Sequence, residues 1–170
     1  MRRNARQSGR AVRTGILAAG AWSSHVKWAG LPPLVDSFPV RGHLVQYAMP
    51  AGCLGPILRR GHTYLFQRTG GALIAGTTTE RVGFDRRIDE SCVQGIRERA
   101  AELLPALAGC EPAEVWNGLR PGAGQADPAV GRIEGSRLWT AYGHYRNGIL
   151  MAPATGRMVA DEIIASWGTG

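Results

Sequence analysis

Residues 62–78 read HTYLFQRTGGALIAGTT, and this stretch decides the fold. Two runs rich in β-branched, aromatic and apolar residues, 62–68 and 72–78, flank the link Thr69-Gly70-Gly71. A three-residue link that contains glycine, placed between two strand-like runs, is typical of a β-hairpin. The stretch therefore predicts an antiparallel strand pair in the middle of the chain.

Further strands are predicted on both sides of the hairpin, because short runs there are apolar, aromatic or β-branched. They cover residues 16–23, 38–47 with a bend at Gly42, 115–120 and 138–142.

Two helices are predicted as well. Residues 89–104 place apolar side chains from Val93 to Leu104 on one face, and Pro105 ends the pattern. A second helix is predicted over about 154–167, with Val159, Ile163 and Trp167 along one side. This order of elements predicts an α+β fold, an antiparallel sheet that carries a packing helix, with α/β fragments at both ends.

Length and composition limit the class of protein. At 170 residues, 44% hydrophobic and 19% charged, the chain has the size and composition of one ordinary folded domain, which excludes a disordered, collagen-like or coiled-coil chain. No uncharged apolar run reaches membrane-spanning length, and no signal-peptide core follows the basic start, so a soluble, cytoplasmic protein is predicted. Cys53, Cys92 and Cys110 show no CxxC spacing and are odd in number, so they are expected to be buried or idle thiols and not metal ligands.

The positive charge is concentrated at the start. Arg2, Arg3, Arg6, Arg10 and Arg13 supply five of the seven net positive charges, which leaves +2 on residues 15–170. Residues 1–14 are therefore predicted to be a disordered basic head. Such a head favours nucleic acid or anionic lipid without reading a sequence, or it reflects an arginine-rich genome or a misplaced start codon; no specific nucleic-acid partner is predicted.

Standard catalytic motifs are absent from the sequence. It contains no GxSxG, HExxH or GxxxxGK[ST] pattern, and residues 122–127 break the dinucleotide fingerprint at its last position and are read as a turn. The four histidines lack metal-ligand spacing, which favours structural hydrogen bonding over ligation.

Three local features nevertheless suggest a binding site. Residues 143–150 lie just before the last predicted helix, whose free N–H groups attract negative charge. Arg120 is the last residue of a predicted strand, where it can either form bidentate hydrogen bonds with a ligand carboxylate or form an internal salt bridge. Tyr64 either offers its hydroxyl to a ligand or covers the core.

Six segments together are more specific than any of them alone. They are AAGAWS at 18–23, PVRG at 39–42, YL at 64–65, GTT at 76–78, WNGLRP at 116–121 and GHYRNGILMAP at 143–153. Over about residues 15–167 this series resembles the C-terminal half of the D-amino acid oxidase family of FAD-dependent oxidoreductases, and the last segment is similar to the glycine oxidase branch of thiamine biosynthesis.

The resemblance implies a division of the chain. Residues 15–44 and 120–170 are similar to parts of the family's FAD-binding domain, and residues 45–119 are similar to its substrate domain. The GxGxxG strand-turn-helix that holds the FAD pyrophosphate in the family does not occur in this sequence. The resemblance therefore implies an incomplete fragment whose FAD pyrophosphate anchor is missing.

The resemblance also implies a reaction. In the family, a hydride passes from the Cα of a small amino acid to the flavin, the imine hydrolyses, and dioxygen is reduced to hydrogen peroxide. A related sarcosine oxidase or D-amino acid dehydrogenase, and a non-catalytic remnant that cannot bind FAD alone, stay open as alternatives. So do a homo-oligomer and a separate N-terminal half as partners.

Site residues follow from the same resemblance. Arg120, Tyr64 and Arg146 match positions that bind the substrate carboxylate, and no residue is expected to act as a catalytic acid or base. The positions that match flavin contacts are His144, Tyr145, Arg146, Asn147, Gly148, Ile149, Leu150, Gly20 and Trp22.

Overall fold

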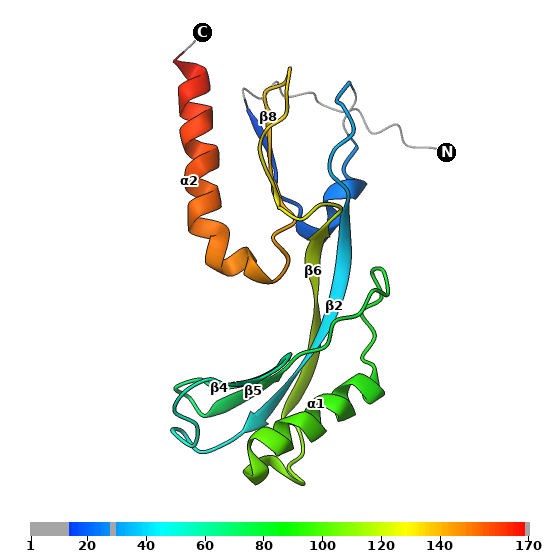
Figure 1. Cartoon of the computed structure of the whole chain (residues 1–170), viewed down its shortest axis with the longest axis vertical. Helices are drawn as coiled ribbons and strands as arrows, with labels where there is room; N and C mark the ends of the chain where they lie inside the picture. Colours follow the sequence, from blue (N-terminus) through cyan, green and yellow to red (C-terminus); the bar gives the residue numbers. More distant parts are fainter. Residues whose placement is uncertain (1–13, 28–29, 169–170) are drawn as a thin grey trace, which may run out of the picture.

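The computed structural model describes residues 14–27 and 30–168, and the head predicted over residues 1–14 lies, apart from Thr14, outside them. Its elements, shown in Figure 1, are β1 (Gly15–Leu17), η1 (Gly20–His25), β2 (Ser37–Ala48), β3 (Leu58–Arg60), β4 (Thr63–Gln67), β5 (Ala72–Gly76), α1 (Glu90–Leu103), η2 (Pro105–Leu107), β6 (Glu114–Ala123), β7 (Ala129–Arg132), β8 (Leu138–Tyr142), η3 (Tyr145–Asn147) and α2 (Gly148–Trp167).

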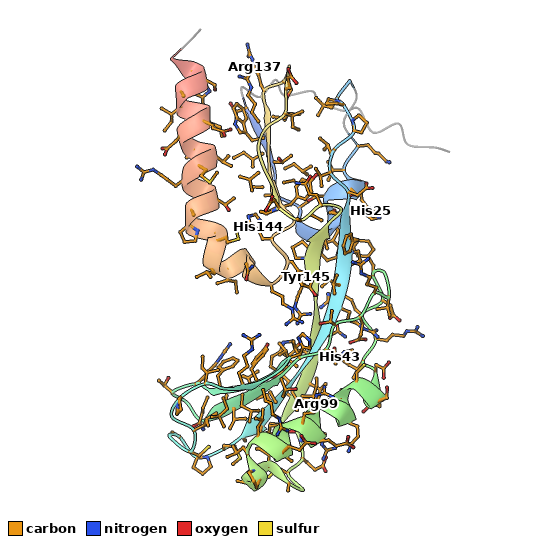
Figure 2. The ribbon with its side chains drawn as sticks, in the orientation of Figure 1. His25, His43, Arg99, Arg137, His144 and Tyr145 are labelled. Carbon is orange, nitrogen blue, oxygen red and sulfur yellow. The ribbon has the colours of Figure 1, made fainter. Side chains whose placement is uncertain are left out.

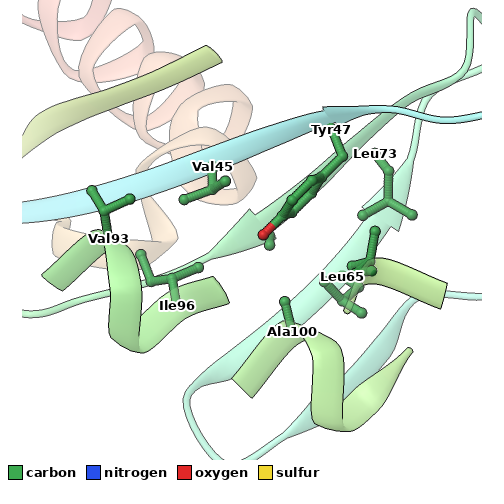
Figure 3. Close-up of a cluster of buried hydrophobic side chains, with 9 residues drawn as sticks. Val45, Tyr47, Leu65, Leu73, Val93, Ile96 and Ala100 are labelled. Carbon is green, nitrogen blue, oxygen red and sulfur yellow. The ribbon is translucent and has the colours of Figure 1, made fainter. Parts of the chain in front are cut away.

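A five-stranded antiparallel sheet forms the lower part of the molecule, in the order β3-β4-β5-β2-β6. The predicted hairpin is confirmed as β4 and β5, and α1 packs on one face of the sheet (Figure 1). Apolar side chains from both layers meet between them, among them Val45, Leu65 and Ile96 (Figure 3). Each of these three is fully buried, and such a side chain stabilises the fold by about 1.5–3 kcal/mol.

Helix α1 agrees with its prediction to within one residue at each end. Its buried residues are Val93, Ile96 and Ala100, at the spacing of one helix face. Asp89 is the N-cap, and its Oδ1 accepts hydrogen bonds from the N–H groups of Ser91 and Cys92 at 3.0 and 3.2 Å. The cap satisfies donors that the helix itself leaves unpaired.

Replacing Asp89 by Ala is expected to lower the free energy of unfolding by about 1 kcal/mol, because the first turn of α1 loses its capping acceptor. Urea titration of the purified 170-residue chain measures the change. The matched control is Asp127→Ala, an exposed carboxyl group in the turn after β6, which should leave stability unchanged. Equal stability of the two variants would contradict the capping role.

A smaller three-stranded sheet, β1-β8-β7, forms the upper part together with α2. β1 pairs with β8 in parallel and β7 pairs with β8 antiparallel. Here the prediction needs correction: the buried strand expected over 16–23 ends at Leu17, Ile16 is half exposed, and the chain turns into the short helix η1. Gly20 has a φ of +58°, which glycine adopts without strain and which suits this turn.

Helix α2 also differs from its prediction. It begins at Gly148, six residues before the predicted start, and includes Pro153. Val159 and Ile163 are buried as expected, but Trp167 is 57% exposed. Gly148, Ile149 and Leu150 therefore form the first helical turn, although the sequence placed them in a loop.

The long strands β2 and β6 join the two parts as a ribbon (Figure 1). Along an antiparallel strand pair, two kinds of residue pair alternate. In one kind the two residues exchange backbone hydrogen bonds, and in the other kind their N–H and C=O groups point outward, away from the partner strand. Arg41 turns its N–H and C=O outward to Glu80, so the Arg41–Leu119 pair is of the outward kind. The pair Pro39–Pro121, two positions along, is of the same kind, so neither missing N–H interrupts the ribbon.

The observed α+β architecture confirms the predicted fold class. Strands β3 and β7, which the sequence analysis did not predict, add one edge to each sheet. None of the helices within the described residues is long and apolar enough to cross a membrane.

Candidate active site

A cavity of about 490 Å³ lies where the ribbon, the sheet and the start of α2 meet. Figure 2 shows Tyr145 at this junction, between the upper part and the five-stranded sheet. The cavity is lined by Tyr64, Thr77, Leu119, Arg120, Pro121, Tyr145, Arg146, Gly148 and Ile149. The structure thus brings six of the predicted site residues together: Arg120, Tyr64, Arg146, Tyr145, Gly148 and Ile149.

Arg120 is held in this cavity by neutral oxygen atoms. Its Nη2 donates to Oγ1 of Thr77 at 2.7 Å, and its Nη1 donates to the carbonyl oxygen of Thr78 at 3.2 Å. Its guanidinium lies against Gly42, where a Cβ atom would overlap it. No carboxylate within the described residues forms an ion pair with Arg120, so the alternative of an internal salt bridge is wrong.

The charges around the cavity favour an anion. Burial and then the charge of Arg146 lower the pKa of Arg120 from its usual value. Burial alone raises the pKa of Tyr145, but hydrogen bonds with Arg146 and Thr79 and the charges of both arginines outweigh it and lower that pKa. Two guanidinium groups therefore act on the same space, and a carboxylate placed there would relieve their repulsion.

Arg146 is fixed from the side of the sheet. Its Nη2 donates to Oγ1 of Thr79 at 2.6 Å, and its guanidinium lies 5.7 Å from the centre of the Tyr145 ring. Tyr145 has a φ of +52°, a left-handed conformation that is costly for a bulky residue. The turn before α2 thus adopts an unfavourable backbone conformation at Tyr145, and this conformation places the Tyr145 and Arg146 side chains at the cavity.

Tyr64 lies over Gly76 of the neighbouring strand at the cavity wall. It is half-buried, its ring stacks on Phe66 at 6.2 Å, and a Cβ at Gly76 would come within 3.0 Å of its hydroxyl oxygen. A glycine at position 76 therefore permits the close approach of the ring.

The start of α2 combines exposed apolar side chains with a first turn that no side chain caps. Ile149 and Leu150 are 95% and 82% exposed, and no side chain caps the N–H groups of the first turn. Such a helix end offers hydrogen-bond donors and a positive dipole end to a ligand.

Five of the predicted cofactor residues are not part of the cavity lining. His144 instead pairs its Nε2 with Oγ1 of Thr155 at 2.8 Å, and Asn147 and Leu150 are exposed near the start of α2. Gly20 and Trp22 lie in η1, where the Trp22 ring packs on Phe84 with centres 5.1 Å apart.

Sequence reasoning missed Thr77, Leu119 and Pro121 as lining residues. Leu119 and Pro121 flank Arg120 and could have been found as its neighbours on β6. Thr77 lies in the segment GTT at 76–78, but nothing in that segment points to Arg120, because their contact depends on the pairing of β5 with β2.

A second polar cluster, behind the cavity, is a hydrogen-bond network. His43, Glu80 and Cys92 lie close enough together to suggest a metal site. However, Nδ1 of His43 pairs with Oε1 of Glu80 at 2.9 Å, and its Nε2 accepts from the N–H of Asp89 at 3.2 Å. Both ring nitrogens are in use, so His43 links β2 to the start of α1, as the structural interpretation of the histidines predicted.

The three thiols are free, but only partly as predicted. Cys53 is exposed, whereas Cys92 and Cys110 are partly buried. Burial, together with the charges of Glu80 and Asp89, raises the pKa of Cys92, so this thiol stays protonated at neutral pH.

Comparisons with known proteins agree with this geometry. The family model described as "FAD dependent oxidoreductase" (DAO) matches residues 2–162. The glycine oxidase of Pseudomonas aeruginosa is 40% identical over 149 residues, which cover 86% of this chain and 40% of that protein. The bifunctional protein ThiO/ThiG of Synechocystis is 37% identical over 88% of this chain and 23% of its own length.

Solved structures give the same result. The crystal structure of glycine oxidase from Bacillus cereus superposes with a TM-score of 0.83 at 30% identity, over 89% of this chain and 43% of that one. The chain thus spans about 40% of the length of the glycine oxidases that it matches.

Proposed function

The chain belongs to the DAO family of FAD-dependent oxidoreductases, and we propose that it forms the substrate side and the flavin-ring contact of an amino-acid oxidase acting on glycine. The observation that carries the proposal is the shared cavity: Arg120, anchored by neutral oxygens, faces the same space as the start of α2. The similarity to glycine oxidases supports glycine as the substrate and dioxygen as the electron acceptor.

The residues at the start of α2 fit the ring end of FAD. Ile149 and Leu150 offer apolar surface, and the first turn of α2, which no side chain caps, would present its positive dipole end to the oxygen-bearing edge of the ring. When bound, FAD supplies the redox chemistry by accepting the two electrons of the substrate. The sequence contains no GxGxxG fingerprint, so these residues account only for contacts with the ring.

Side chains from the sheet and from η3 would bind and orient the substrate. Arg120 and Arg146 would pair with its carboxylate, and the hydroxyl group of Tyr64 would donate a further hydrogen bond to it. A carboxylate held by both guanidinium groups would fix the orientation of the amino group and Cα in the cavity. The protein's contribution is therefore positioning, which explains why no acid or base is needed among these residues.

The division of the chain is part of the proposal. Residues 15–44 and 120–170 would belong to an FAD-binding domain, and residues 45–119 would belong to a substrate domain. Strand β2 crosses the first boundary and strand β6 crosses the second. The similarity to a bifunctional ThiO/ThiG protein supports a role in thiamine biosynthesis, and a cytoplasmic location fits that role.

A chimera tests the function. The 149-residue segment of the Pseudomonas aeruginosa glycine oxidase that matches this chain is replaced by this chain. We expect the purified chimera to retain FAD, seen as visible flavin absorbance, and to release hydrogen peroxide when glycine is added in air. A chimera that holds FAD but produces no peroxide from glycine or other small amino acids would refute the proposal.

A further inference from the structure

Arg120 meets its anchors along one edge of its guanidinium. Thr77 and Thr78 accept from its two terminal nitrogens, at 2.7 and 3.2 Å, and use two of its five N–H groups. The other N–H groups remain for a ligand in the cavity that Arg120 lines. A planar group gripped along one edge can present its remaining donors in a fixed plane.

The hydroxyl group of Thr77 has a fixed direction. It donates to the carbonyl oxygen of His43 in β2 at 2.9 Å, closer than the carbonyl oxygen of Thr78 at 3.4 Å, and a lone pair of the same hydroxyl oxygen accepts from Arg120. The Thr77 side chain is buried, and His43 is itself held by Glu80 and Asp89. The direction of the acceptor is therefore set by the sheet.

Gly42 provides the surface beneath the guanidinium. It lies inside β2, where glycine weakens a strand, and a Cβ at this position would come within 2.5 Å of Cζ of Arg120. Because Gly42 has no side chain, the guanidinium of Arg120 can lie directly against the backbone of β2.

The two anchors bring no negative charge into contact with Arg120. Thr77 and Thr78 offer only neutral oxygens, whereas the nearby Arg41 is paired with Glu80 at 2.6 Å. A carboxylate in the place of Thr77 would hold Arg120 equally well, but it would compete with the carboxylate of a ligand. Burial and then the charge of Arg146 lower the pKa of Arg120, and the opposing charges of Tyr145, Tyr64 and Glu80, none of which forms an ion pair with it, offset this only in part.

We propose that Thr77 is a positioning residue for the substrate carboxylate: its hydroxyl, oriented by the His43 carbonyl, holds the Arg120 guanidinium against Gly42 while leaving its charge to the ligand. This inference rests on the proposed function, because it assigns the ligand of Arg120 as a carboxylate substrate.

Kinetics of the chimera test the role of Thr77. Thr77→Val keeps the shape but removes the hydroxyl, and we expect KM for glycine to rise about tenfold while kcat changes much less, because carboxylate binding is weakened. Thr77→Ser restores the hydroxyl and should bring KM back to within about twofold of the parent. The control is Thr69→Val, in the exposed turn between β4 and β5, which should match the parent.

A second readout uses the 170-residue chain itself. In nitrogen-15 NMR spectra, an anchored guanidinium rotates slowly and gives separate signals for its terminal nitrogens, which Arg120→Lys identifies by their loss. We expect separate Arg120 signals in the parent and in Thr77→Ser, and merged signals in Thr77→Val. If Thr77→Val does not fold, Thr77→Ala serves as the second variant.

The outcomes separate the two proposals. The positioning role is overturned if the parent chimera is active and Thr77→Val has the same KM for glycine as the parent. It is also overturned if the Arg120 nitrogen signals of Thr77→Val are the same as those of the parent. A parent chimera that binds FAD without glycine-dependent peroxide overturns the proposed function instead, and the NMR comparison then still decides whether Thr77 holds Arg120.

Discussion

Replacing Arg120 by Ala in the chimera is expected to raise KM for glycine at least about tenfold, because the substrate carboxylate loses a charge-assisted, bidentate partner worth at least about 1.4 kcal/mol. The effect should be large because Arg120 is partly buried and has no internal carboxylate partner among the described residues. Steady-state peroxide release at varied glycine concentration measures it.

Two further variants sharpen this test. Arg120→Lys keeps a positive charge but loses the planar fork, so KM should stay well above that of the parent. Arg59→Ala removes an exposed arginine of β3, whose Nε donates only to a nearby carbonyl in its own turn, and should leave KM unchanged. A parent-like KM in Arg120→Ala would remove this residue from carboxylate binding.

Replacing Glu80 by Ala is expected to lower the free energy of unfolding at neutral pH by about 3 kcal/mol. Arg41 is only 4% exposed, and Glu80 accepts from its Nε at 2.8 Å and its Nη2 at 2.6 Å. Glu80 also accepts from His43 at 2.9 Å. Asp85 and Asp89 lie farther from Arg41, at 3.7 and 3.9 Å, and compensate only in part.

The same carboxyl group gives stability a pH dependence. Burial raises the pKa of Glu80, but hydrogen bonds from Thr78, Arg41 and His43 outweigh it and hold the pKa below its ordinary value of 4.5. Its contribution is therefore complete above pH 4.5 and is lost as the pH falls through the lowered pKa of the folded state.

Urea titrations of the 170-residue chain at neutral and acidic pH check both statements. The stability difference between the parent and Glu80→Ala should be largest at neutral pH and should shrink on acidification. Glu134→Ala, an exposed carboxyl group between β7 and β8, is the matched control and should behave as the parent at each pH. A difference that does not vary with pH would contradict the titration of Glu80.

The elements that the sequence predicted best are those with local signals. The β4–β5 hairpin follows from its glycine link, and α1 follows from its apolar spacing and from Pro105, which ends the pattern. α2 begins six residues earlier than predicted and includes Pro153, a residue that normally opens or ends a helix. The carbonyl that Pro153 leaves without its helical donor is that of Ile149, which lies on an exposed turn where water can replace the donor.

The site residues were predictable only in part, because some of them are brought together by contacts between distant strands. Thr77 and Gly42 stand in the segments GTT at 76–78 and PVRG at 39–42, but their roles beside Arg120 arise only from pairings between distant strands. The β2–β6 register brings Arg120 over a residue nearly eighty positions away in sequence, and no local pattern encodes such a register.

The pair Pro39–Pro121 also affects the tendency of this molecule to self-associate through its strand edges. Exposed strand edges invite another chain to add a strand and begin aggregation. On the outer edge of β2, the N–H groups of Ser37 and Arg41 are already bonded within the chain, and Pro39 between them has none to offer. Pro121 interrupts the outer edge of β6 at the same level, so the ribbon is protected against edge-to-edge association on both sides at the height of the cavity.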